Sequence, residues 1–112
     1  MDIIAWQKAY ELTLKIYKLT INFPKNEEFG LKSQIRRASI SIISNIAEGF
    51  KRQGLADRIK FYNMAETSLE EVKCQSLISH DLNYINDSEF KDLFNLLNET
   101  GRILNGWIKN QK

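Results

Sequence analysis

The feature that most constrains this fold is an apolar repeat at the start of the chain, whose spacings alternate between four and three residues. The repeat consists of Ala5, Ala9, Leu12, Ile16, Leu19 and Phe23. Such spacing places every member on one face of an α-helix and is typical of helices that pack as in coiled coils. The repeat stops before Pro24, because a residue that precedes proline is disfavoured in the helical conformation. We therefore predict a first helix over roughly residues 2–22.

The middle of the chain keeps the helical period after a short connection at 24–28. Five glycines and one proline in 112 residues provide few signals for turns or strands. A second helix is predicted over about 29–50. We expect it to end at Gly49, since glycine inside a helix costs about 1 kcal/mol relative to alanine.

The second half of the chain predicts two more helices. The third should cover about 55–83. The fourth should begin at Asn86-Asp87-Ser88-Glu89, because Asn86 and Glu89 have the spacing of a capping box. Gly101 interrupts the apolar repeat of this fourth helix. It either lets another helix approach closely or is a local weakness.

Four helices with short connections predict an all-α, antiparallel up-down-up-down bundle that fills 1–112 as a single domain. In this topology Trp6, near the start of the first helix, and Trp107, near the end of the fourth, should lie at the same end. The third helix is the longest, at about 40 Å, and is expected to extend beyond its neighbours.

Composition favours a cytoplasmic protein without catalytic chemistry. Hydrophobic residues make up 43% of the chain and charged residues 27%, and Cys74 has no partner for a disulfide. No apolar run approaches the roughly 20 residues that span a bilayer. The single histidine, His80, lacks the glutamate spacing of di-iron bundles. We predict no catalytic residue, no cofactor and no metal, and interpret Glu48 as part of an ion pair near Arg37 rather than as an acid or base.

Charge is distributed unevenly along the chain. Residues 32–60 carry seven basic and two acidic side chains, a net +5, whereas 61–112 carry five basic and eight acidic, a net −3. Such a basic segment either attracts phosphates or forms a solvated face with local counter-charges. The candidate nucleic-acid contacts are Arg36, Arg37, Lys51, Arg52, Arg58 and Lys60.

The second predicted helix has more apolar surface than a monomeric bundle needs. Its core stripe is flanked by further apolar residues, so the apolar arc covers about half the circumference instead of the usual ~100°. The flanking residues are Ile40, Ile43, Ala47 and Phe50. The first helix has a similar excess in Trp6, Tyr10, Leu14 and Tyr17. This excess predicts a second apolar neighbour, and we expect a homo-oligomer.

A polar stripe runs along the same second helix. It consists of Gln34, Arg37, Ser41, Ser44, Asn45 and Glu48, with several members four residues apart. The stripe is either a hydrogen-bonded network at a subunit contact or a surface that contacts phosphates and bases. We favour the network, and predict Gln34, Ser41, Asn45 and Glu48 as oligomer-interface residues.

Several motifs identify a family resemblance over nearly the whole chain. They include Trp6-x-Lys8-Ala9, Phe29-Gly30-Leu31, Gln34-x-Arg36-Arg37-Ala38, Asn45-Ile46-Ala47-Glu48-Gly49 and Ala65-x-x-Ser68-Leu69-x-Glu71. With these motifs the chain resembles the four-helix-bundle proteins encoded in intervening sequences of bacterial 23S rRNA genes. It is also similar in fold to the accessory variability determinant proteins of diversity-generating retroelements.

The resemblance implies a homopentamer around a central channel that binds RNA or DNA, with Arg36, Arg37, Asn45, Glu48 and Arg52 as the positions to examine. We therefore expect a non-enzymatic, oligomeric nucleic-acid-binding protein. Two alternatives are a scaffold for a partner such as a reverse transcriptase-like protein, and an intervening-sequence product with no host function.

Overall fold

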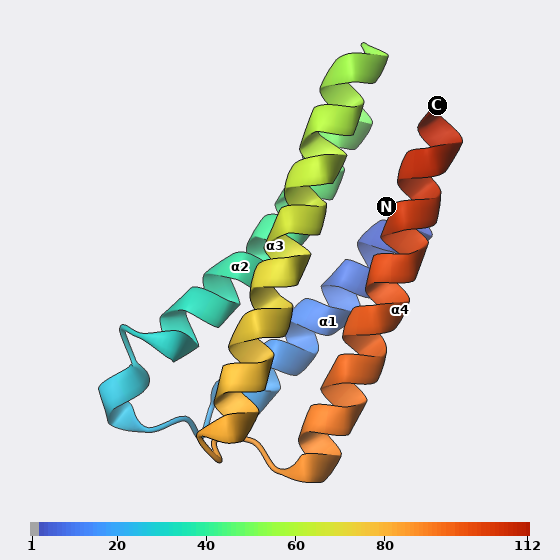
Figure 1. Cartoon of the computed structure of the whole chain (residues 1–112). Coiled ribbons are helices and arrows are strands. Elements are labelled where there is room, and N and C mark those ends of the chain that lie inside the picture. Colours follow the sequence, from blue (N-terminus) through green and yellow to red (C-terminus); the bar gives the residue numbers. More distant parts are fainter. Residues whose placement is uncertain (1–2) are drawn as a thin grey trace.

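The computed structural model describes residues 3–112, and in this range the chain forms four α-helices and one short 3-10 helix, without strands (Figure 1). The elements are α1 (Ile4–Thr20), η1 (Lys25–Glu27), α2 (Leu31–Lys51), α3 (Leu55–Asp81) and α4 (Asp87–Gln111). Helices that follow one another in sequence run in opposite directions, as the up-down-up-down prediction requires. The all-α prediction is confirmed for these residues.

Each helix contributes one apolar stripe to a common core. The first predicted repeat is buried at Ala5, Ala9, Leu12 and Ile16, while Leu19 is half-buried at the rim. The core residues of the other three helices are Ile35, Ala38, Ile42, Ile46, Tyr62, Ala65, Leu69, Val72, Leu93, Leu97, Leu104 and Ile108. Burial of each large aliphatic side chain contributes about 1.5–3 kcal/mol, so this core is the main source of stability.

The prediction for Gly49 is wrong, because α2 continues past this residue to Lys51. Gly49 is buried in the helix, and a Cβ atom placed there would lie 2.5 Å from Cε1 of Tyr62 on α3. The glycine therefore serves close packing of α2 on α3 and does not end the helix. Gly101 behaves similarly: a Cβ atom there would lie 3.2 Å from Cδ2 of Leu69. This contact supports the close-approach interpretation of Gly101.

The capping box of α4 is confirmed. The backbone N–H of Glu89 donates to Oδ1 of Asn86 at 2.8 Å, and the backbone N–H of Asn86 donates to Oε1 of Glu89 at 2.8 Å. The preceding helix α3 ends two residues earlier than predicted, at Asp81. Asn83 adopts a left-handed conformation with φ of 65°, which turns the chain toward α4.

A carboxylate fastens η1 to both α2 and the α3–α4 turn. Oε1 of Glu27 accepts the backbone N–H of Leu31 at 2.9 Å, and Oε2 accepts the hydroxyl of Tyr84 at 2.8 Å. The Leu31 hydrogen bond first, and then the Tyr84 hydrogen bond, lower the pKa of Glu27. The same carboxylate raises the pKa of Tyr84, because it favours the neutral phenol.

The ends of the bundle follow the predicted arrangement. An apolar pocket brings Ile3 and Ile4 of the chain start beside Trp107 of α4, so Trp6 and Trp107 lie at one end. At this end the α2–α3 hairpin projects past the start of α1 and the end of α4 (Figure 1). The predicted overhang is confirmed, and it includes the end of α2 as well as the start of α3.

Substitution Gly49→Ala should destabilise the protein by about 1–3 kcal/mol, because the added methyl group would overlap the buried ring of Tyr62. Gly106→Ala is the matched control. Gly106 is also helical, but a Cβ atom there meets nothing within 4 Å, so alanine should stabilise the protein by up to about 1 kcal/mol. Urea unfolding of both variants measures the difference. Equal effects at the two positions would contradict the close contact.

The Glu27 hydrogen bonds should make stability depend on pH at the acid end. Because the pKa of Glu27 is lowered in the fold, its contribution is present above the ordinary carboxyl range and is lost as pH falls through the folded pKa. Glu27→Gln should therefore destabilise the protein more at pH 6 than at pH 3. Urea unfolding at both values measures this change. Glu70→Gln removes only an exposed contact with Lys73 and should show a smaller difference.

Candidate nucleic-acid and subunit interfaces

The structure separates the six predicted nucleic-acid contacts into two groups, one in the first half of α2 and one around the α2–α3 turn. Arg36 and Arg37 lie in its first half, whereas Lys51 lies about 22 Å further along the helix axis. Lys51, Arg52, Arg58 and Lys60 surround the α2–α3 turn and form what we call the turn cluster. One compact site therefore cannot contain all six residues.

The turn cluster combines two anchored arginines with two free lysines. Arg52 pairs with Oε2 of Glu48 at 3.0 Å, and its guanidinium carbon lies 4.7 Å from the ring centre of Phe61. Nε of Arg58 donates to the backbone carbonyl of Arg52 at 2.9 Å. Within residues 3–112, Lys51 and Lys60 are exposed and form no ion pair. The cluster therefore presents charge at the projecting end of the hairpin.

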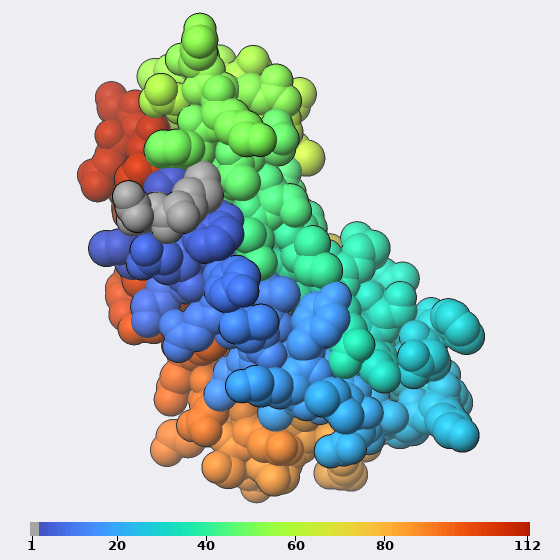
Figure 2. All heavy atoms as spheres, turned by 180° about the vertical axis from the view of Figure 1, so that it is seen from behind, coloured from blue at the N-terminus to red at the C-terminus, as the bar shows by residue number. Residues whose placement is uncertain are grey.

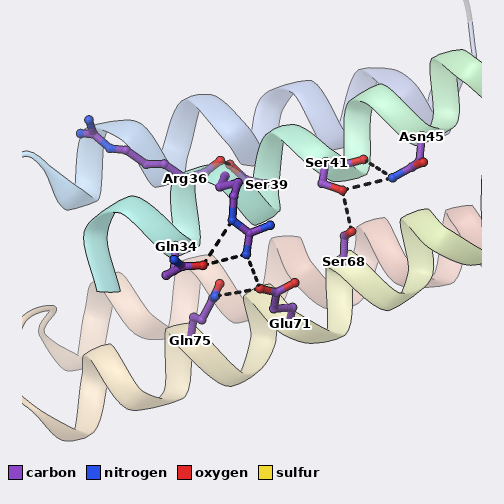
Figure 3. A network of polar contacts seen from close by, with 9 residues as sticks. Gln34, Arg36, Ser39, Ser41, Asn45, Ser68, Glu71 and Gln75 are labelled. Atoms are coloured by element: carbon purple, nitrogen blue, oxygen red, sulfur yellow. Dashed lines mark hydrogen bonds and ion pairs between the residues drawn. The ribbon is translucent and has the colours of Figure 1, made fainter. Parts of the chain in front are cut away.

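Arg36 forms hydrogen bonds to α1 that the sequence did not predict. Its Nε donates to Oγ1 of Thr20 at 2.8 Å, and its Nη2 donates to the carbonyl of Tyr17 at 3.1 Å. The guanidinium carbon lies 4.4 Å from the ring centre of Tyr17. Figure 3 shows the side chain directed away from the polar contacts between α2 and α3. Arg36 thus caps the end of α1, with two of its five donors.

The polar stripe of α2 meets α3 of the same chain (Figure 3). Oγ of Ser41 lies 2.8 Å from Oγ of Ser68, and Nδ2 of Asn45 donates to the carbonyl of Ser41 at 2.9 Å. Arg37 donates to Oε2 of Glu71 at 3.0 Å. The expected hydrogen-bonded network exists within one subunit. A role in contacts between subunits stays a prediction.

One pairing in the stripe differs from expectation. Glu48 pairs with Arg52, not with Arg37, because Arg37 lies three helical turns away and reaches Glu71 instead. Gln34 is exposed and accepts from Nη2 of Arg37 at 2.7 Å. Ser68 and Glu71 were recognised only as motif positions. Their three-residue spacing on α3 was the signal that one face of α3 could meet the stripe.

The apolar excess of α1 and α2 remains at the surface of the single chain. Tyr10 and Leu14 are each 47% exposed, and Ile40 is 44% exposed. Trp6 is half-buried and stacks on Tyr10 with ring centres 5.3 Å apart. Figure 2 shows the face on which α1 lies beside α2. Tyr10, Leu14 and Ile40 therefore leave apolar surface exposed on α1 and α2, whereas Trp6 and Ile43 also pack against the core.

The metal-ligating side chains of the described residues are dispersed, and the single histidine has a structural contact. Across residues 3–112 there is no group of three or more His, Cys, Asp or Glu side chains arranged to hold a metal. His80 contacts Oδ1 of Asp87 at 2.7 Å and stacks on Phe90, so it joins the ends of α3 and α4. None of the helices described has the length and apolarity to cross a membrane.

Comparison with known proteins supports the four-helix fold. A structure from Bacteroides thetaiotaomicron VPI-5482, described as a protein with unknown function from the S23 ribosomal protein family, has 25% sequence identity and a TM-score of 0.86, and the match covers 95% of this chain and 96% of that chain. No curated protein matches. Residues 1–106 match the family model described as 23S rRNA-intervening sequence protein. The chain therefore belongs to the 23S rRNA-intervening sequence protein family.

Proposed function

We propose that this chain is a non-enzymatic four-helix-bundle protein that assembles into a homo-oligomer and binds RNA or DNA in the cytoplasm. The observation that carries the proposal is the turn cluster at the projecting end of the α2–α3 hairpin. Four basic side chains there stand against only Glu48 and Asp57. Lys51 and Lys60 are exposed at this projecting end and are accessible to a phosphate backbone, whereas Nη1 of Arg58 contacts Oε1 of Gln111 at the end of α4 at 3.5 Å (Figure 1).

The four cations of the turn cluster are better suited to contacts with the phosphate backbone of a nucleic acid than to recognition of its bases. Lys51 and Lys60 are free point charges, whereas the two arginines are oriented by Glu48, Phe61 and a backbone carbonyl. Held guanidinium groups lose little conformational freedom on binding a phosphate. Contacts of this kind position a nucleic acid without reading its sequence.

Self-association would bring several turn clusters together. The exposed apolar residues of α1 and Ile40 of α2 supply a surface for a second copy. A pentamer is the assembly that the family resemblance implies, and five linked clusters would raise the affinity for a long polyanion through multivalency. Of the four predicted interface residues, Ser41 contacts Ser68 of α3 and Asn45 contacts Ser41. Gln34 and Glu48 instead pair with neighbouring arginines of their own segment.

The same apolar surface also favours a second candidate function. A protein partner, such as a reverse transcriptase-like enzyme, would cover Tyr10 and Leu14 as well as a second copy would. A partner that stays bound after nuclease treatment would favour this scaffold function. A product without host function would show neither a nucleic acid nor a protein partner.

The double substitution Lys51→Glu and Lys60→Glu should weaken binding to a 20-nucleotide RNA and to duplex DNA by about tenfold or more at low salt. The slope of log K against log salt should also fall by about one to two units, because up to two phosphate contacts are lost. Fluorescence anisotropy across a salt series measures both. Lys18→Glu with Lys91→Glu makes the same charge change at exposed positions elsewhere. Equal losses in the two variants would contradict a defined site.

Substitution Leu14→Glu should lower the mass of the assembly, because it places a charge in the proposed apolar contact. The expected cost is about 2 kcal/mol or more per contact. Light scattering after gel filtration measures the mass. Leu77→Glu is the matched control, since Leu77 has the same 47% exposure but lies on α3. A wild-type monomer at micromolar concentration would refute self-association.

A further inference from the structure

A second basic region lies at the opposite end of α2 from the turn cluster. There, a groove of about 470 Å³ runs between the end of α1 and the first half of α2. Three cations, Lys32, Arg36 and Arg37, line it together with Phe29 and Tyr17. We call it the aromatic groove. Its residues on α2 share one face because they recur at three- and four-residue spacings.

Phe29 is the unusual member of the aromatic groove. Its side chain is 93% exposed, more than any other large hydrophobic residue in the described chain. It precedes α2 in a short turn and makes no ring contact within residues 3–112. An aromatic ring in water, without packing partners, gains no stability for the subunit. It is available as a flat apolar surface for a ligand.

The charges around Phe29 are only partly satisfied within the chain. Nζ of Lys32 lies 3.1 Å from Oε2 of Glu28, which is the one acidic residue among those that line the groove. Arg37 is shared with Gln34 and Glu71. Arg36 keeps Nη1 without a partner in the described residues while its stacking holds the ring of Tyr17 in place. Three basic side chains face Glu28 in the lining and Glu71 beside it, which leaves a net charge of +1, located at Arg36.

We propose that the aromatic groove binds single-stranded nucleic acid, with a base stacked on Phe29 and the adjoining phosphates on Lys32 and Arg36. The inference rests on the proposed nucleic-acid function and specifies its substrate class. An unpaired strand offers the face of a base together with a phosphate, whereas a duplex keeps its bases stacked on one another. A protein partner could cover Phe29, but it would also have to supply an acceptor for the unpaired charge of Arg36, which a polyanion does directly.

The test uses the full chain, a fluorescein-labelled 12-nucleotide oligouridylate and a 12-base-pair RNA duplex. Phe29→Leu keeps an apolar side chain but removes the ring, and because Phe29 is exposed the fold should not change. The variant should bind oligouridylate at least about fivefold more weakly, as expected for loss of one stacked base, and bind the duplex within twofold of wild type. Phe29→Tyr keeps the ring and should retain both affinities.

The outcomes separate this inference from the proposed function. Unchanged oligouridylate binding by Phe29→Leu, together with lost binding in the Lys51→Glu and Lys60→Glu variant, would overturn the aromatic groove and leave the turn cluster in place. Absence of all binding by wild type would overturn both. A lower mass of Phe29→Leu by light scattering would make Phe29 a subunit contact and also overturn the groove.

Photo-crosslinking gives a second, independent readout on wild-type protein. A 12-nucleotide oligomer of 5-bromouridine should crosslink to the peptide that contains Phe29 or to the one that contains Tyr17, as mapped by mass spectrometry. Crosslinks confined to residues 48–61 would contradict the proposal.

Discussion

The close approach of α2 to α3 at Gly49 is the contact on which the other features depend. The absence of a side chain at Gly49 lets the ring of Tyr62, which is 1% exposed, lie directly on α2. Trp107 of α4 then packs edge-on against Tyr62, with ring centres 6.2 Å apart. This contact fixes the depth and register of the α2–α3 seam. The same register places Ser41 opposite Ser68, and the α2–α3 turn projects past the start of α1.

The seam explains why one helix carries apolar, polar and basic side chains together. The apolar stripe of α2 faces the core, its polar stripe contacts α3, and Arg36 turns toward α1. Arg37 and Glu71 are both well exposed, so their ion pair contributes little to stability. Its use is to favour one register of α2 against α3. Phe29 at one end of α2 and Lys51 at the other take part in none of these contacts, and both side chains are exposed.

Local periodicity and capping predicted the four helices, the core stripe of α1 and the start of α4 at Asn86. These local patterns gave wrong helix ends where the structure depends on a contacting residue that is distant in sequence. Gly49 looked like a helix end because Tyr62, which requires the glycine, lies on another helix. Helix α1 ends at Thr20, two residues before the predicted end at residue 22. At this point Arg36 of α2 donates hydrogen bonds to the hydroxyl of Thr20 and to the carbonyl of Tyr17. Phe29 attracted no functional interpretation, because exposure of an aromatic residue is not visible in the sequence.

We propose that nucleic acid binds at the two ends of α2, whereas α4 packs in the core. Amide hydrogen exchange of the wild-type protein, with and without saturating single-stranded RNA, tests it most directly. Slower exchange in peptides covering 29–37 and 50–60, with unchanged exchange in 87–100, is the expected result. Slower exchange confined to α4, or no change anywhere in the presence of RNA, would contradict a nucleic-acid role for α2.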